Sequence, residues 1–187
     1  LFGGGRFQSG RTTFRTTGQD EHAKIVISIE DACRGTTRMF TLTRPEVDAD
    51  GHLVNREQTI SVTIPKGVIE GQRIRLKGQG QPGLGGGESG DLYLEIAFSE
   101  HDRYQAEYRD LHLTLPVTPW EAALGATVDV NTLEGKVKLK VPAGSQSGSK
   151  LRLKGKGICS KLKSGDLYAT LKIVTPPAKT DEQKKLY

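Results

Sequence analysis

The feature that most constrains the fold is a long motif that occurs twice in the chain. The first copy, at residues 64–80, reads IPKGVIEGQRIRLKGQG, and the second, at residues 141–157, reads VPAGSQSGSKLRLKGKG. An SGDLY motif follows each copy, at residues 89–93 and 164–168. A repeat of this length marks a supersecondary unit that is used more than once. The sequence therefore predicts two tandem, related domains.

Strand patterns dominate both copies. In residues 23–29, apolar and polar side chains alternate with the period of a half-buried strand. The same alternation recurs at residues 60–64, 111–117, 137–141 and 167–173. Short helices are predicted at residues 30–34 and 119–124, and a glycine follows each of them. We expect a mainly all-β protein of two related β-sandwich-like domains with short helices and the start of a C-terminal helix.

The domain boundaries follow from the repeat and from local composition. Residues 1–19 are rich in Gly, Arg, Ser, Thr and Phe and are predicted to be the remnant of a linker. The first domain is expected over residues 20–104 and the second over residues 105–178. Because residues 1–19 have the composition of the end of a longer linker, we expect a fragment of a longer protein. Residues 179–187 are predicted to begin a C-terminal helix that stops before it could be stable alone.

Composition narrows the classes of function. A net charge of +5 permits contact with nucleic acid or acidic peptides, although 22 acidic residues dilute this signal. No apolar run approaches the roughly 20 residues of a membrane span, so no membrane contact is expected. Cys33 and Cys159 are the only cysteines and lie far apart in sequence. We therefore expect no disulfide framework and no cysteine-rich zinc site, as suits a reducing cytoplasm.

Two patterns imitate ligand sites. Residues 78–83 fit G-x-G-x-x-G, but no helix is predicted after them, which favours a plain loop over a dinucleotide site. Residues 46–57 imitate a calcium-binding loop, yet strands flank them, and a hairpin turn at Asp50 and Gly51 explains the same residues. The histidines lack metal-ligand spacing, and no nucleophile motif is present. We predict no enzyme, no catalytic residue, no cofactor and no metal.

What remains is apolar strand surface in the first domain, between residues 23–29 and residues 38–42. The open edge of a small sandwich can take an extended peptide as an additional strand. Met39 adds a pliable apolar side chain that suits varied partners. From the pattern alone, however, the alternating apolar residues of these strands are better explained as ordinary core.

The repeated motifs, together with LPVTPWEAALG at residues 115–125, resemble the C-terminal region of DnaJ co-chaperones. The resemblance extends from about residue 18 to the end. The chain has none of the C-x-x-C-x-G-x-G motifs of the zinc-finger class, so it resembles class B, most nearly the bacterial curved-DNA-binding type. The resemblance implies β-domains that bind unfolded polypeptide clients and deliver them to a DnaK-type chaperone. It also implies a homodimer in the full-length protein and a location in the cytoplasm or on the nucleoid.

The resemblance further implies a client groove between the first two strands of the first domain. The predicted client-binding residues are Ala23, Ile25, Arg38, Met39, Phe40, Leu42, Leu94 and Ile96. Arg38 matches a basic residue that the family carries before the phenylalanine, whereas Thr41 departs from the basic residue expected after it. Client binding is therefore the leading hypothesis.

DNA binding is the alternative that the resemblance supports. The candidate contacts are basic residues on strands of both copies: Arg75, Lys77, Lys136, Lys138, Lys140, Arg152, Lys154 and Lys156. Binding through these side chains would be mainly to phosphate and would fall steeply with salt.

Overall fold

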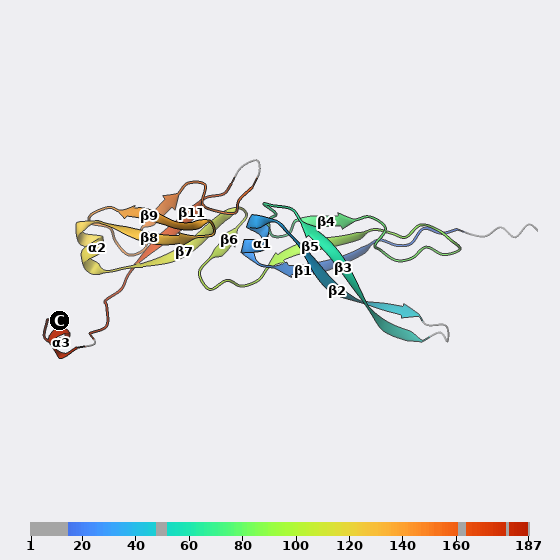
Figure 1. Cartoon of the computed structure of the whole chain (residues 1–187), viewed down its shortest axis with the longest axis horizontal. Helices are drawn as coiled ribbons and strands as arrows, with labels where there is room; N and C mark the ends of the chain where they lie inside the picture. Colours follow the sequence, from blue (N-terminus) through green and yellow to red (C-terminus); the bar gives the residue numbers. More distant parts are fainter. Residues whose placement is uncertain (1–14, 48–51, 161–163, 179, 187) are drawn as a thin grey trace, which may run out of the picture. The chain divides into compact units, whose positions relative to one another are not determined.

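The computed structural model describes residues 15–47, 52–160, 164–178 and 180–186 (Figure 1). The first copy of the repeat comprises β1 (Glu21–Ile27), α1 (Ile29–Arg34), β2 (Thr36–Val47), β3 (Leu53–Ile64), β4 (Arg73–Leu76) and β5 (Leu92–Phe98). The second comprises β7 (Asp110–Val117), α2 (Pro119–Leu124), β8 (Ala126–Thr132), β9 (Gly135–Val141), β10 (Lys150–Leu153) and β11 (Leu167–Ile173). β6 (Gln105–Glu107) lies between the copies, and α3 (Asp181–Leu186) follows them.

Both copies use the same sheet order. In the first, β1, β5 and β4 form one sheet, and β2 pairs with β3 in a separate hairpin. In the second, β7, β11 and β10 take the same order, β8 pairs with β9, and β6 adds to the other edge of β7. The sequence repeat is thus a repeat of the fold, and the predicted mainly all-β, sandwich-like architecture is confirmed.

The chain separates into two compact units. The smaller comprises Leu1–Ile25 and Gln72–Glu95, and the larger comprises Val26–Gly71 and Ile96–Tyr187. These units divide the chain differently from the repeat, and the domain boundaries expected from the sequence stay a prediction. In the part of the chain that the structure describes, no helix is long and apolar enough to cross a membrane.

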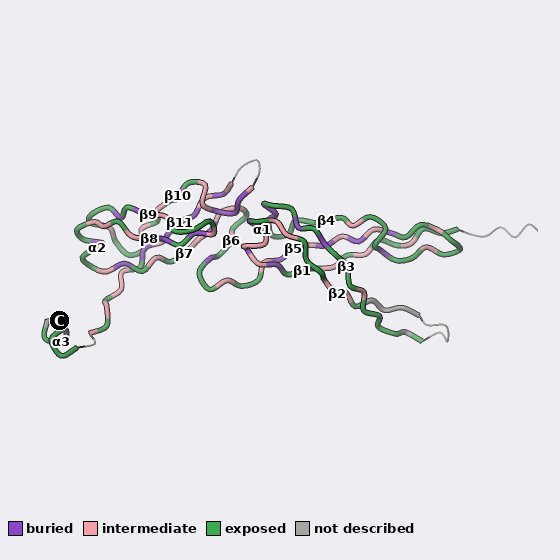
Figure 2. The backbone as a smooth tube through the Cα atoms, in the orientation of Figure 1, coloured by how far each residue is buried: buried purple, intermediate pink, exposed green. Residues whose placement is uncertain are grey.

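The core of the larger unit follows the predicted alternation. Figure 2 shows buried and exposed residues succeeding one another along the strands. One cluster of the larger unit consists of the buried residues Ile29, Tyr104, Leu111, Val130, Leu139, Leu153, Ile158, Leu167 and Ala169. All but Ile29 and Tyr104 belong to the second copy, so α1 of the first copy contributes a side chain to the core of the second.

The short helices predicted inside the two copies both form, and each ends at the predicted glycine. The Ser28 hydroxyl accepts the Asp31 N–H at 3.1 Å and caps α1. Before α2, the Glu121 carboxylate accepts the Thr118 N–H at 2.8 Å, and this hydrogen bond lowers the pKa of Glu121. Gly35 and Gly125 end the helices with φ values of 73° and 82°, which glycine adopts without strain.

The end of the predicted linker is paired with the glycine-rich loop between β4 and β5. Thr16 and Leu84 exchange two backbone hydrogen bonds, of 3.1 and 2.9 Å. The approach is so close that a Cβ atom at Gly87 would lie 2.2 Å from the Thr16 carbonyl oxygen. Residues 15–19 therefore continue the packed structure, while the rest of the predicted linker and the predicted turn at Asp50 and Gly51 lie outside the described residues.

Candidate functional site

The β2–β3 hairpin presents one partly apolar face. Arg38 lies opposite Val62 and Phe40 opposite Ile60, and both β3 residues are buried. Because side chains two residues apart share one face of a strand, Arg38, Phe40 and Leu42 lie together. Phe40 and Leu42 are half-buried, so part of each remains available at the surface.

Between residues 37 and 43, the other face of this hairpin is polar apart from Met39. The Met39 side chain is 75% exposed and lies opposite Ser61. On either side, the hydroxyls of Thr37 and Thr41 lie 3.2 and 3.4 Å from threonine hydroxyls of β3. Met39 is among the predicted client-binding residues together with Phe40 and Leu42, but adjacent residues of a strand point to opposite faces. The part of Met39 in client binding stays a prediction.

The predicted cation Arg38 is paired within the chain. Its guanidinium donates to the Asp31 carboxylate of α1 at 2.9 Å. Burial acts to raise the pKa of Asp31, but the hydrogen bonds from Arg38 and Ser28 outweigh burial and leave the pKa below its usual value. An acidic ligand would have to compete with Asp31 for this guanidinium.

The remaining predicted client residues are mostly interior. Ile25 on β1 and Leu94 and Ile96 on β5 are buried, whereas Ala23 is half-buried. The apolar side chain that β1 exposes is instead Val26, at 60%. The surface available to a ligand on these strands therefore comes from few of the predicted residues, and their binding role stays a prediction.

The strands that carry the predicted residues lie at sheet edges. β1 is the outer strand of its sheet, and among the described strands β2 pairs only with β3 (Figure 1). An outer strand offers backbone N–H and C=O groups to an extended polypeptide. Such pairing needs no particular sequence in the ligand.

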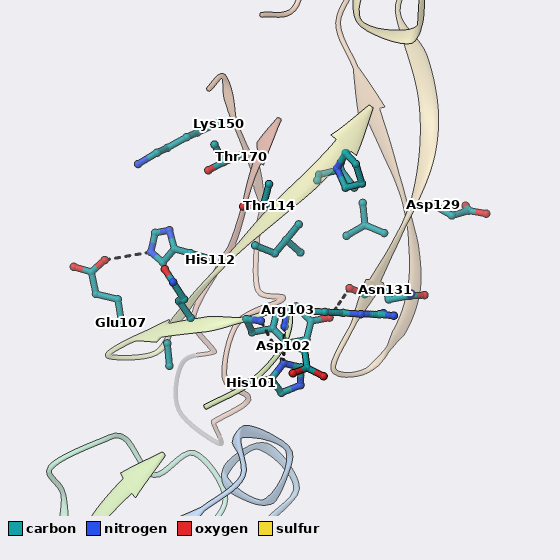
Figure 3. A pocket seen from close by; sticks show the side chains of 17 residues that line it. His101, Asp102, Arg103, Glu107, His112, Thr114, Asp129, Asn131, Lys150 and Thr170 are labelled. Atoms are coloured by element: carbon teal, nitrogen blue, oxygen red, sulfur yellow. Dashed lines mark hydrogen bonds and ion pairs between the residues drawn. The ribbon is translucent and has the colours of Figure 1, made fainter. Parts of the chain in front are cut away.

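A hollow of about 970 Å³, which was not predicted from the sequence, lies beside β7 in the second copy (Figure 3). Its lining comes from residues 101–107, 112–116 and 129–131, with Lys150 and Thr170. His112 Nε2 lies 3.2 Å from Glu107 Oε2 in this lining. β6 pairs with β7 only from Asp110 to His112, so in the described structure the rest of this β7 edge has no strand partner.

Three of the predicted DNA contacts form a row on β9. Lys136, Lys138 and Lys140 are all exposed, while the residues between them face the core. Across the ladder, the row meets one acid, Asp129, which lies opposite Lys138, and two uncharged residues. This face of the β8–β9 hairpin is therefore positively charged.

The arginine in the first copy of the RLKG motif has a structural partner. Arg75 Nε donates to Asp91 Oδ2 at 2.6 Å, and the other oxygen of Asp91 accepts the Gly78 N–H at 2.8 Å. The hydrogen bond from Gly78, followed by that from Arg75, holds the pKa of Asp91 below its usual value. The acid of the SGDLY motif thus closes the turn after β4.

The second copy repeats this arrangement. Asp166 accepts the Gly155 N–H at 2.7 Å and pairs with Arg152 at 2.7 Å. The Gly155 hydrogen bond is again the main reason that the pKa of Asp166 is low. Lys156 pairs with Glu134 at 2.8 Å. Three predicted DNA contacts, Arg75, Arg152 and Lys156, therefore already pair with acids, whereas Lys77 and Lys154 are exposed beside the two turns.

Two stacked ring pairs were not predicted from the sequence. His22 stacks on Tyr93 with ring centroids 5.1 Å apart, and His112 stacks on Tyr168 at 5.3 Å. The histidines are scattered along the sequence, although a D-x-H spacing opens both copies. Among the described residues, no three His, Cys, Asp or Glu side chains gather as metal ligands.

The two cysteines, far apart in sequence, are neighbours in the structure. Cys33 of α1 and Cys159 of the loop after β10 form a disulfide-bonded pair with Cα atoms 4.8 Å apart. The sequence led us to expect no disulfide framework, and the spacing of two cysteines cannot reveal a contact that the tertiary fold creates.

Comparison with known proteins gives consistent matches. Residues 22–176 match the family described as DnaJ C terminal domain. A "Curved DNA-binding protein" of Coxiella burnetii is 49% identical over 188 residues, which cover 98% of this chain and 60% of that protein. Proteins of the same name from Citrobacter koseri and Pseudomonas putida are 44% and 43% identical, covering 96% and 100% of this chain and 59% and 58% of those proteins. The chain spans about three fifths of the length of these relatives.

Proposed function

The chain belongs to the DnaJ C terminal domain family, and from that premise we propose that it is the part of a co-chaperone that binds non-native polypeptide. The observation that carries the proposal is the outer strand β2, whose edge is open in the described structure and whose face holds Phe40 and Leu42 half-buried. An extended client would pair with the β2 backbone and place apolar side chains against these two residues.

This mode of binding suits clients of varied sequence. Backbone hydrogen bonds supply affinity without reading side chains, and a small apolar surface accepts many different ones. The open edge of β7, beside the hollow of the second copy, offers pairing of the same kind. In the full-length protein, we propose, a homodimer presents the bound client to a DnaK-type chaperone in the cytoplasm.

The test compares Phe40→Ala with Met39→Ala, two neighbours on opposite faces of β2. We expect Phe40→Ala to weaken binding of a permanently unfolded protein roughly tenfold, which corresponds to about 1.4 kcal/mol. Because the contact is apolar, the loss should depend little on salt. Met39→Ala should leave the affinity within about twofold. Fluorescence anisotropy with a labelled client measures both, after circular dichroism has shown that both variants are folded.

Two outcomes would count against the proposal. Equal affinities for wild type and Phe40→Ala would remove this face of β2 from the client site. A loss confined to Met39→Ala would place the site on the threonine-rich face instead.

DNA binding is a second candidate, which we propose for the β9 row of Lys136, Lys138 and Lys140. The exposure of this row and the name of the relatives favour it. Lysine side chains on a strand reach phosphate oxygens, and each contact releases condensed counterions from the duplex. The binding would depend little on sequence and could coexist with client binding on β2.

Reversing the charge of all three lysines to glutamate should weaken binding to a duplex by at least about tenfold at moderate salt. It should also reduce the slope of log K against log salt by roughly 3, because about 0.9 of a counterion is released per phosphate contact. The matched control is Lys24→Glu, which changes an exposed lysine on β1. Gel shifts over a salt series measure both, and an unaltered slope in the triple variant would exclude the row.

A further inference from the structure

Cys33 and Cys159 are brought together by a junction that does not depend on a bond between them. The Gly67 N–H donates to the Ala32 carbonyl of α1 at 2.7 Å. A Cβ atom at Gly67 would lie 2.9 Å from the Cys159 carbonyl oxygen, so the backbones pack closely there. Ile29 of α1 is buried in the same cluster as Ile158, the residue before Cys159. Packing and hydrogen bonds therefore hold the two sulfur atoms side by side.

The surroundings make the two sulfur atoms chemically different. The Cys159 N–H points at Cys33 Sγ, 3.3 Å away, and a hydrogen bond to sulfur favours its thiolate form. Cys159 Sγ instead lies 3.2 Å from Glu134 Oε1, a hydrogen-bond acceptor that favours the protonated thiol, while the other oxygen of Glu134 pairs with Lys156. When both cysteines are reduced, Cys33 is thus the better nucleophile.

The pair is not required by the repeated fold. The residue of α2 that corresponds to Cys33 in α1 is Ala123, and the residue of the first copy that corresponds to Cys159 is Pro82. The same architecture therefore forms without a sulfur atom at either place. Both side chains are nearly buried, at 5% and 4% exposure, so reaction is limited to small reagents or to moments of local opening.

We propose that Cys33 and Cys159 form a reversible thiol–disulfide switch that peroxides oxidise. The Cys33 thiolate attacks one oxygen of hydrogen peroxide, the O–O bond breaks, and Cys33 becomes a sulfenic acid while one water leaves. The Cys159 sulfur then attacks Cys33 Sγ, forms the S–S bond and displaces the hydroxyl as a second water. In total, the two thiols lose two protons and two electrons, and a dithiol reductant restores them by exchange.

Oxidation would tie α1 covalently to the loop after β10, across a sequence separation of 126 residues. The same helix carries Asp31, which holds the Arg38 guanidinium on β2. A cross-link over so long a loop removes much chain entropy from the unfolded state, so it stabilises the folded chain. The switch would therefore stabilise the folded chain against unfolding when peroxide accumulates and remove that stabilisation when reducing conditions return.

The experiment begins with the fully reduced wild-type chain. After treatment with hydrogen peroxide, the protein is acid-quenched, denatured and alkylated, and its intact mass is measured. We expect a loss of two hydrogens, no alkylation at either cysteine, and a cross-linked peptide pair containing both. Dithiothreitol should restore two alkylated cysteines, and oxidation should raise the midpoint of thermal unfolding by roughly 5–10 °C.

Single variants test the order of attack. In Cys159→Ser, the remaining Cys33 should be trapped as a sulfenic acid by dimedone, whereas Cys159 in Cys33→Ser should react at least tenfold more slowly. If either variant fails to fold, the count of alkylated cysteines in the wild-type chain still tests the switch. Two alkylated cysteines after peroxide treatment, or sulfinic acid without a cross-link, would overturn the switch, and equal dimedone labelling would overturn the role of Cys33.

Discussion

Replacing Gly165 with alanine is expected to lower the midpoint of thermal unfolding by roughly 10 °C or more. A Cβ atom at Gly165 would lie 1.8 Å from the Arg109 carbonyl oxygen and 2.3 Å from its carbon. Both are backbone atoms, so the clash cannot be relieved by turning a side chain. Relief would break the hydrogen bond from the Gly157 N–H to the Gly165 carbonyl, which spans 2.9 Å. We expect the free energy of unfolding to fall by about 4–5 kcal/mol. In a chain of this size, each kcal/mol lowers the midpoint by about 2–4 °C.

The matched control is Gly144→Ala. Gly144 has a φ of 75°, which disfavours alanine, but nothing lies within 4 Å of the position of its Cβ atom. Backbone strain alone should cost about 1–2 kcal/mol and a few degrees. Differential scanning calorimetry of both variants separates strain from close approach. Equal shifts would contradict the close approach of residues 109 and 165.

The variant Ile29→Ala is expected to lower the free energy of unfolding by about 2–4 kcal/mol, because it leaves a cavity in a packed core. Ile29 belongs to α1 of the first copy but is buried among Leu111, Ile158 and Leu167 of the second. The only tryptophan, Trp120, lies on α2 of the second copy. Its fluorescence in a urea titration should therefore report the loss, although the altered residue is in the first copy.

The control is Val26→Ala, which also truncates a β-branched side chain, three residues before Ile29. The Val26 side chain is 60% exposed, so its truncation should change the free energy of unfolding by no more than about 0.5 kcal/mol. An unchanged Trp120 transition in Ile29→Ala would mean that this helix is not part of the core of the second copy.

The fold could be predicted largely from local signals. Alternation marks strands such as β11, in which Leu167, Ala169 and Leu171 are buried, because a two-residue period acts within one strand. The glycines after α1 and α2 mark helix ends for an equally local reason. The repeat then supplied the second domain from the first, without any knowledge of tertiary contacts.

The candidate site was harder to predict because alternation does not distinguish a ligand face from a core face. The alternation at Leu94 and Ile96 fits a ligand face as well as a core face, and the structure buries both side chains. Met39 and Phe40 are adjacent in β2, so the sequence already implies that their side chains lie on opposite faces. Met39 was nevertheless predicted as a client contact because its side chain is apolar. The Cys33–Cys159 pair depends on how loops pack across 126 residues, which no local pattern records.

The pairing of Thr16 with Leu84 holds a stretch of backbone against the glycine-rich loop of the first copy. Residues 15–20 run beside this loop through hydrogen bonds such as that from the Gly18 N–H to the Glu88 carbonyl, 2.8 Å long. Fully extended, these residues would span roughly 20 Å, at about 3.3 Å per residue. A side chain at Gly87 or Gly90 would meet the backbone of this stretch, so the glycines of the loop decide whether that length of chain stays docked or is set free.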